Sequence, residues 1–276
     1  ACRCDPAAPE FFCDDCRRKA AAGARMKEES VPMRVVELPV SATEDRVVGT
    51  LDIEAAIRHG RKEFEAGILA EANRSILYVD EINLLDDHIV DILLDSAAMG
   101  VNTVEREGIS YAHPARFVLV GTMNPEEGDI RPQLLDRFAL SVTVTGEREA
   151  KDRIEVVKRR IAYEQDAEGF AASYREQQEA LRERIERARS LLKSVAVADR
   201  MLEKAAHISL ALGVDGHRAD ITLIKAAMAN AAFSGRTEVE KEDMKAVSRL
   251  VLAHRLRRRP FEEGEVDWSA VDDILA

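Results

Sequence analysis

The sharpest change from apolar to polar residues in the chain lies at residues 76–83. Four apolar residues, 76–79, lead directly into two adjacent carboxylates, Asp80 and Glu81. A continuous apolar run of this length predicts a strand that is buried on both faces of a parallel sheet. Because ligands bind at the carboxyl ends of such strands, the acidic pair suits a site for Mg²⁺ and a nucleotide. The alternative is that the two acidic residues only begin a solvated loop.

The pattern predicts alternating strands and helices up to about residue 146. After the acidic pair, a helical stripe over residues 85–97 ends at Gly100, which is a natural C-cap. A second buried strand over residues 115–124 also ends in a polar residue, Asn124. The other elements predicted for this part are an extended segment at 35–40, an exposed turn-forming segment at 41–49, helices at 51–59, 64–72 and 131–138, a hairpin at 101–114 with its turn near 107–108, and a strand at 140–144.

The character of the sequence changes near Glu147. Residues 147–195 are highly charged, with a narrow apolar stripe that predicts a connecting helix packed on one side only. Further helices are predicted at about 197–212, 219–233 and 241–258. An α/β part therefore precedes an all-helical part, with the boundary near 146–150. The predicted division is a Cys-rich segment at 1–30, an α/β core at 31–146, the connecting helix at 147–195 and a helical domain at 196–276.

Composition and charge narrow the class of protein. Hydrophobic residues make up 46% of the 276 residues, which is enough to bury a core. Charged residues make up 33%, which is enough to keep the surface solvated. The net charge of −11 argues against a general nucleic-acid or anionic-membrane binder, although the basic stretch at 255–259 remains a candidate local contact. No apolar run approaches the roughly 20 residues that span a bilayer. With no secretory signal pattern at the start of the chain, we expect a cytoplasmic protein without nucleic-acid or membrane partners.

All four cysteines lie in the first 16 residues, namely Cys2, Cys4, Cys13 and Cys16. The C-x-C and C-x-x-C pairs are candidate ligands for a tetrahedral Zn²⁺ or, as a second option, an iron–sulfur cluster. Only the C-x-x-C half has the spacing typical of zinc sites. Because a reducing compartment disfavours structural disulfides, metal binding, a plain Cys-bearing loop and redox switching all remain open.

Three further residues follow the acidic pair in an order that phosphate chemistry can use. Asn124 could position the attacking water or sense the γ-phosphate, or it could be a structural amide that caps the strand end. Arg137 could reach a phosphate on a neighbouring subunit as an arginine finger, or it could form a salt bridge with Asp136. Arg218, at the start of a helix in the second domain, could grip a nucleotide across the interdomain cleft, or it could be an ordinary exposed arginine.

In this order and spacing the residues resemble an AAA+ ATPase. Residues 76–81 look like its Walker B motif, residues 122–124 like sensor 1, residues 135–138 like the arginine-finger segment and residues 216–220 like sensor 2. The match is closer still to the I (ATPase) subunit of magnesium chelatase and its cobalt-chelatase relatives. The resemblance covers about residues 31–260, and the runs that carry it are 42–52, 76–86, 100–108, 124–128 and 131–138.

The resemblance implies a fold and a mechanism. The fold would be α/β, a P-loop-type parallel sheet with flanking helices that is incomplete at the N-terminus, followed by an all-helical lid domain. Hairpin insertions would lie near 41–50 and 101–114. With ATP and Mg²⁺ as cofactors, Asp80 would hold Mg²⁺, Glu81 would polarise the water and Asn124 would position it. Arg137 would act in trans and Arg218 from the lid.

The resemblance also implies partners. The chain would form a ring-shaped homo-oligomer, typically a hexamer, that works with a D-type chelatase subunit. ATP hydrolysis would drive metal insertion into a tetrapyrrole by a separate large catalytic subunit. The Cys-rich opening is also similar to chelatase-like proteins in which the I-type ATPase is fused to a D-type region with an integrin-like metal-binding domain.

The sequence departs from this family in one respect. A phosphate-binding loop, G-x-x-x-x-G-K-[S/T], should precede the Walker B strand, and the 276 residues contain none. In the family this loop lies upstream of the position that matches Ala1, so we expect a truncated chain that binds nucleotide weakly or not at all. Two other functions remain open. One is a MoxR-type AAA+ protein that remodels a partner protein. The other is a non-hydrolysing assembly module with a Cys-bound metal.

Overall fold

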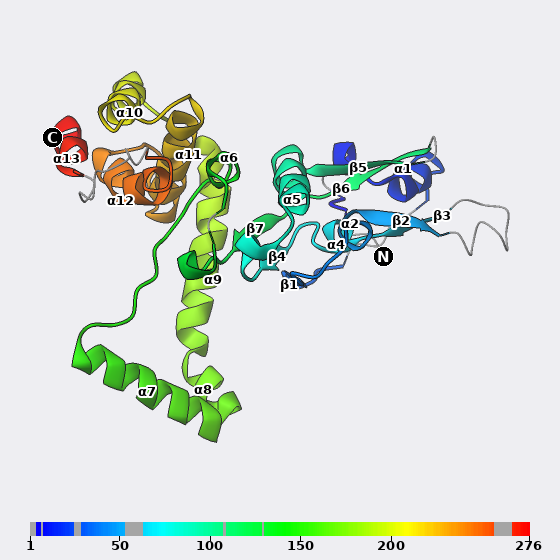
Figure 1. Ribbon diagram of the computed structural model, residues 1–276, viewed down its shortest axis with the longest axis horizontal. Coiled ribbons are helices and arrows are strands. Elements are labelled where there is room, and N and C mark those ends of the chain that lie inside the picture. Colours follow the sequence, from blue (N-terminus) through cyan, green and yellow to red (C-terminus); the bar gives the residue numbers. More distant parts are fainter. Residues whose placement is uncertain are drawn as a thin grey trace. The chain divides into compact units, whose positions relative to one another are not determined.

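The computed structural model describes residues 4–6, 8–24, 29–52, 63–106, 109–128, 130–256 and 267–276. The chain divides into two compact units, Ala1–Arg137 and Phe138–Ala276. The named strands of the described residues all belong to the first unit, whereas the second unit is helical (Figure 1). This confirms the predicted order of an α/β part and a helical part. The finer division into four segments stays a prediction.

A three-stranded parallel sheet forms the centre of the first unit. It consists of β1 (Val35–Leu38), β4 (Ile76–Val79) and β7 (Val118–Gly121), in the order β1-β4-β7. The register pairs Val79 with Leu38 on one side and with Gly121 on the other. The carboxyl ends of β4 and β7 therefore lie next to each other, which is the arrangement that the sequence predicted for a ligand site.

Burial of this sheet differs from the prediction. Leu77 and Val79 are fully buried, but Ile76 and Tyr78, on the other face of β4, are only half-buried. In β7 the side chains of Val118 and Val120 are 57% and 41% exposed. The predictions that β4 is buried on both faces and that β7 is a buried strand are therefore wrong for the described structure. An apolar run shows that residues can be buried, but it does not show which face another element covers.

Two antiparallel hairpins accompany the sheet. The first pairs β2 (Gly49–Asp52) with β3 (Glu63–Ala66), and the second pairs β5 (Val101–Arg106) with β6 (Ile109–Pro114). Phe64 of the first hairpin stacks on Tyr111 of the second, with ring centroids 4.0 Å apart. The hairpin predicted at 101–114 is thus confirmed, although its turn at 107–108 lies outside the described residues.

Three predictions for residues 41–72 differ from the structure. Residues 51–52 of the helix predicted at 51–59 belong to the strand β2, and residues 53–59 lie outside the described residues. The helix predicted at 64–72 is β3 followed by the short helix α4 (Ile68–Glu71). The segment predicted as an exposed turn at 41–49 contains the helix α2 (Glu44–Val48), in which Val47 and Val48 are buried. At Gly49, which has a φ of 102°, a Cβ would lie 2.5 Å from the Glu65 carbonyl, so the tight pairing requires glycine.

The helix α5 (Asp87–Met99) packs against β5 and β7. The Asp86 side chain caps its first turn by accepting a hydrogen bond from the His88 N–H at 2.8 Å. Gly100 ends it in the left-handed conformation, as predicted. The other described helices of this unit are η1 (Pro9–Phe11), α1 (Asp14–Ala21), η2 (Ile82–Leu84), η3 (Pro125–Glu127) and α6 (Pro132–Leu135). The last confirms the short helix predicted within 131–138.

The second unit is built from helices around a core of its own. They are α7 (Ala150–Gln165), α8 (Ala167–Ser173), α9 (Arg175–Leu191), η4 (Leu192–Ser194), α10 (Asp199–Ala211), α11 (Arg218–Phe233), α12 (Lys241–Leu252) and α13 (Ser269–Leu275). Ile208, Leu223, Met244 and Leu252 are fully buried in this core. The predicted helices at 197–212, 219–233 and 241–258 are confirmed, with the last one shorter. The predicted connecting helix is three helices. No helix among the described residues has the length and apolar character needed to cross a membrane.

The strand predicted at 140–144 does not form. Residues 139–148 adopt neither helix nor strand, and Leu140, Val142 and Val144 are exposed. The alternating pattern is present, but a strand also needs a partner that satisfies its backbone hydrogen bonds. Here the Ser141 N–H donates instead to the carbonyl of Leu250, at 2.8 Å, in α12.

The buried Asp243 of α12 pairs with Arg236, which lies in the loop between α11 and α12. The Asp243 side chain is fully buried and accepts hydrogen bonds from both terminal nitrogens of Arg236, at 2.6 and 2.7 Å. It also accepts from Asn230 of α11 at 2.8 Å and from the Glu240 N–H at 2.9 Å, which forms part of a capping box. Burial raises the pKa of Asp243, but these hydrogen bonds outweigh it and hold the pKa below its ordinary value.

Candidate functional site

Asp80 is fixed at the carboxyl end of β4 by two hydroxyl groups. Its Oδ1 accepts hydrogen bonds from Thr122 Oγ1 at 2.6 Å and from the Tyr78 hydroxyl at 2.9 Å. Thr122 directly follows β7, so the parallel register brings the two residues together. These hydrogen bonds, with that from Thr122 the stronger, lower the pKa of Asp80. The carboxylate is therefore ionised at neutral pH.

Glu81 is held by the same threonine. Its N–H donates to Thr122 Oγ1 at 3.0 Å, and its backbone has the left-handed conformation, with φ 51° and ψ 51°. This conformation costs a residue other than glycine on the order of 1 kcal/mol. The negative charge of Glu127 raises the pKa of Glu81, with smaller contributions from desolvation and from Asp80. Glu81 is thus the more basic member of the pair, which suits a group that accepts a proton from water.

The pair fits the cation of a nucleotide complex. Both hydrogen bonds that Asp80 accepts from described side chains end on Oδ1, so Oδ2 can face a ligand. An exposed, ionised carboxylate beside a hydroxyl offers the oxygen ligands that Mg²⁺ prefers. Mg²⁺ keeps several waters and is bound through one or two carboxylates and the phosphates of the substrate.

Asn124 lies in the loop after β7, two residues after Thr122, and is exposed. Its Oδ1 accepts a hydrogen bond from the Glu126 N–H at 3.2 Å and so caps η3. A structural capping role is therefore present, as one of the two interpretations expected. The amide nitrogen is the group of this side chain that could still donate to a water or a phosphate, so the functional role stays a prediction.

Arg137 contacts two aspartates of α5 rather than solvent alone. Its Nη1 lies 2.8 Å from Asp91 Oδ1, and its Nη2 pairs with Asp95. The side chain is 22% exposed. The two aspartates are four residues apart and so lie on one face of the helix. They hold the guanidinium in one place.

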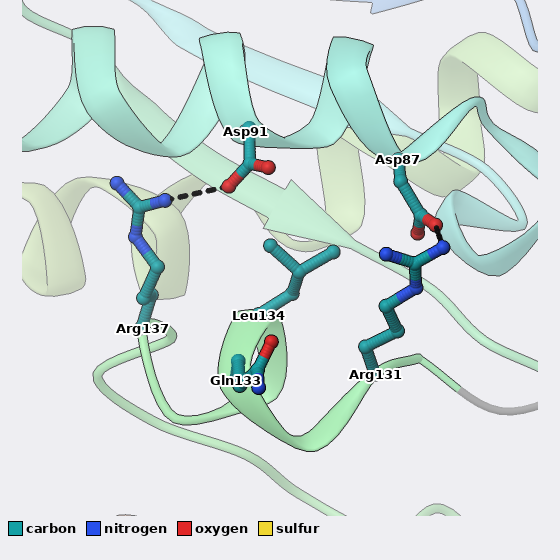
Figure 2. A pocket seen from close by; sticks show the side chains of 6 residues that line it. All are labelled: Asp87, Asp91, Arg131, Gln133, Leu134 and Arg137. Atoms are coloured by element: carbon teal, nitrogen blue, oxygen red, sulfur yellow. Dashed lines mark hydrogen bonds and ion pairs between the residues drawn. The ribbon is translucent and has the colours of Figure 1, made fainter.

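Arg137 and Asp91 help to line a small hollow (Figure 2). Its floor is Leu134, which lies between the Arg137–Asp91 pair and a second pair of Arg131 with Asp87. The residues that line the hollow are Asp87, Asp91, Arg131, Gln133, Leu134 and Arg137. Asp80, Glu81 and Asn124 are not among them. The hollow around Arg137 is therefore separate from the acidic pair.

Arg218 begins α11 in the second unit, as the sequence predicted, and its side chain is exposed. Its carbonyl accepts a hydrogen bond from Thr222 Oγ1 at 2.7 Å. Because Arg218 and the acidic pair belong to different units, its contact with a nucleotide stays a prediction.

The cysteines form a separate group. Cys4, Cys13 and Cys16 lie together in the first unit, with their sulfur atoms within 4.8 Å of one another. Cys2 lies outside the described residues. The three described thiols are therefore brought together as the sequence suggested.

Sequence reasoning missed several residues that shape the site. Tyr78 is two residues before Asp80 and so projects from the same face of the strand, which was a usable signal. The hydroxyl of Thr122 could also have been found, because it ends the neighbouring strand. The roles of Asp91 and Asp95 could not be found, since their spacing shows a shared helix face but not what that face contacts.

Comparison with known proteins identifies the family. Residues 22–138 match the family model of an AAA domain (dynein-related subfamily), and residues 202–274 match that of an AAA lid domain. The chain is 51% identical over 272 residues to the magnesium-chelatase subunit ChlI homolog of Methanocaldococcus jannaschii, covering 99% of this chain and 74% of that protein.

Two further relatives agree. The chain is 52% identical over 260 residues to the magnesium-chelatase 38 kDa subunit of Acidiphilium rubrum, covering 94% of this chain and 75% of that protein. It is 50% identical over 258 residues to the magnesium-chelatase subunit ChlI of Anabaena variabilis, covering 94% and 76%. The resemblance seen in the motifs extends over almost the whole chain. The chain therefore belongs to the family of the magnesium-chelatase subunit ChlI, with an AAA domain followed by an AAA lid domain.

Proposed function

We propose that this chain is the ATPase motor subunit of a magnesium or cobalt chelatase, which couples ATP hydrolysis to metal insertion into a tetrapyrrole. The observation that carries the proposal is the cluster of Asp80, Glu81 and Thr122 at the carboxyl ends of two parallel strands. The names of the relatives as magnesium-chelatase subunits supply the substrate class. The cofactors are ATP and Mg²⁺, and Mg²⁺ would neutralise charge on the phosphates when it is bound.

Each residue of the cluster has a distinct role in this proposal. Asp80 binds the cation or a water of its shell, because its pKa is low and Tyr78 and Thr122 fix its orientation. Glu81 orients the attacking water and accepts its proton, because its raised pKa makes it the stronger base. Thr122 holds both residues, since it donates to the Asp80 carboxylate and accepts from the Glu81 N–H. Asn124 positions the water through its amide nitrogen.

The two arginines complete the site from other parts of an assembly. Arg137 acts in trans on the phosphates of a neighbouring copy in a homo-oligomeric ring, expected to be a hexamer. Its ion pairs with Asp91 and Asp95 preorganise the guanidinium before the neighbour arrives. Arg218 contacts the nucleotide from the lid. The ring acts with a D-type chelatase subunit and with the large catalytic subunit, in which the tetrapyrrole receives its metal.

The test is the Glu81→Gln variant in a protein that joins these residues to the phosphate-binding loop that the resemblance places upstream of Ala1. The amide cannot accept a proton, so turnover should fall by about 10²–10⁴-fold while ATP binding persists. Glu126→Gln is the matched control, because it makes the same change at an exposed position in the nearby η3. Normal hydrolysis by Glu81→Gln would show that Glu81 is not the catalytic carboxylate.

A non-hydrolysing assembly module with a metal bound by cysteines is the second candidate, and the group of Cys4, Cys13 and Cys16 favours it. In that case the protein that carries the loop would show no turnover for Glu81→Gln to remove. A MoxR-type remodelling protein would lose turnover in the same way, but purified chelatase subunits would gain no metal insertion from its addition.

A further inference from the structure

A cluster of three thiols lies outside the proposed nucleotide site. Cys13 and Cys16 are buried and Cys4 is half-buried, and the sulfur atoms all lie within 4.8 Å of one another. Cys4 comes from the chain before η1, whereas the other two flank the start of α1. A loop and a helix start thus converge on one point.

The spacing of the sulfur atoms suits a single tetrahedral metal ion. A Zn–S bond of about 2.3 Å places the sulfurs of a tetrahedral site about 3.8 Å apart. The observed limit of 4.8 Å is therefore within about 1 Å of that geometry. A loop and the first turn of a short helix can close this difference. Borderline-soft Zn²⁺ binds thiolates strongly, whereas Mg²⁺ and Ca²⁺ prefer oxygen ligands.

The backbone around the sulfur atoms suits sulfur ligands. The Cys13 N–H donates a hydrogen bond to Cys4 Sγ at 3.2 Å, an interaction that strengthens when the sulfur is a thiolate. Cys13 is the N-cap of α1 and Cys16 is in its first turn, where the positive end of the helix dipole stabilises an anion. Of the basic residues 17–19 that follow, Arg18 and Lys19 pair with Asp15. Phe12, which is 5% exposed, packs against the thiols and shields them from water.

The cluster is anchored at the edge of the sheet opposite to the nucleotide site. Asp5 pairs with Arg74 at 3.3 Å, and the Arg116 guanidinium lies 4.2 Å from the centre of the Phe11 ring. Arg74 and Arg116 precede β4 and β7, whereas Asp80 follows β4. A metal ion at the thiols would therefore brace the N-terminal segment against the sheet and would take no part in hydrolysis.

From these observations we propose that Cys4, Cys13 and Cys16 bind one structural Zn²⁺ that fastens the N-terminal segment to the amino-end edge of the sheet. Cys2 lies outside the described residues, and the proposal rests on the three described thiols. The site is independent of the proposed ATPase function, because it uses neither the acidic pair nor Arg137 and Arg218.

The experiment measures zinc in the purified 276-residue chain by mass spectrometry of the elements, after loading with Zn²⁺ under reducing conditions and removal of loosely bound metal. We expect about one zinc per chain, and less than about a tenth of this in the Cys13→Ser/Cys16→Ser double variant. Asp15→Asn, at an exposed position of the same helix, should keep its zinc. Substoichiometric zinc in the wild-type chain, or equal zinc in the double variant, would overturn the proposal. Iron with labile sulfide would overturn it as well.

A second measurement covers the case in which the serine variants do not fold. All cysteines of the chain lie in its first 16 residues, so alkylation reports on this segment alone. Zn²⁺ should slow alkylation of Cys4, Cys13 and Cys16 in the intact wild-type chain by at least about tenfold, as peptide mass spectrometry would show. Equal alkylation rates with and without Zn²⁺ would contradict a thiolate site. ATP turnover does not enter either measurement, so failure of this proposal and failure of the proposed function are distinguishable.

Discussion

Replacement of Asp243 by alanine tests whether its ion pair with Arg236 and its hydrogen bond to Asn230 of α11 stabilise the second unit. The variant loses two hydrogen bonds from Arg236, one from Asn230 and one from the Glu240 N–H. Net hydrogen bonds to a charged group contribute about 1.5–3 kcal/mol each, but they are not additive within one cluster.

The magnitude follows from what remains after the change. Breaking a buried ion pair costs about 3–5 kcal/mol when the remaining charge stays buried. Arg236 keeps 31% of its side chain exposed, so water recovers part of its solvation. Loss of the capping box adds about 1 kcal/mol. We therefore expect the unfolding free energy of the second unit to fall by about 2–4 kcal/mol.

The assay is urea denaturation followed by the fluorescence of Trp268. This is the only tryptophan of the chain, and it packs partly against the core of the second unit, so it reports on that unit. Asp272→Ala is the control. It removes a carboxylate that pairs with Lys245 at 2.7 Å, but both side chains are more than half exposed, so the expected cost is below about 1 kcal/mol.

Two results would refute the reasoning. One is a denaturation midpoint for Asp243→Ala no lower than that for Asp272→Ala. The other is a loss of unfolding free energy in Asp243→Ala that stays the same as the pH is lowered. Because the pKa of Asp243 is lower in the folded state, its contribution is complete above the unfolded value of about 3.9 and disappears as the pH falls through the folded value. The difference between wild type and Asp243→Ala should therefore shrink in strong acid.

Three further predictions concern the first unit and the site. Burial lowers the pKa of His113, so the unfolding free energy should fall as the pH decreases below the unfolded pKa of about 6.5. In thermal unfolding, the His113→Gln variant should lack this dependence of stability on pH. In the protein that carries the phosphate-binding loop, Arg137→Ala should lower turnover by about 10³-fold, whereas Arg131→Ala, which alters the same hollow, should not; equal effects would exclude a finger role. The 276-residue chain should bind ATP more weakly than micromolar by calorimetry, and micromolar binding would contradict this.

Elements with local signals could be predicted from the sequence. The α5 helix has a capping Asp86, an apolar stripe and Gly100 at its end, and all three act within one stretch of chain. The hairpin of β5 and β6 is likewise local. By contrast, the exposure of Val118 in β7 and the missing strand at 140–144 depend on whether another element covers or pairs with the segment. Local pattern carries no information about that partner.

The site follows the same division. The positions of Asp80 and Glu81 at a strand end were predictable, because the apolar run and the acidic pair are adjacent in sequence. The ion pairs of Arg137 with Asp91 and Asp95 were not, since they join segments about 40 residues apart. The left-handed backbone of Glu81 also escaped prediction, because the sequence contains no glycine or asparagine there to indicate it.

The left-handed backbone of Glu81 means that selection for stability and selection for catalysis favour different residues at position 81. Glycine or asparagine would adopt the φ of 51° with less strain, so either could raise the unfolding free energy by up to about 1 kcal/mol. Neither supplies a carboxylate. A library of variants screened only for survival of heat or protease should therefore drift away from glutamate at this position. The same library screened for ATP turnover should return to it. Few other positions of the first unit would separate the two screens so cleanly, since Arg74 is the only other described residue besides glycine with a positive φ.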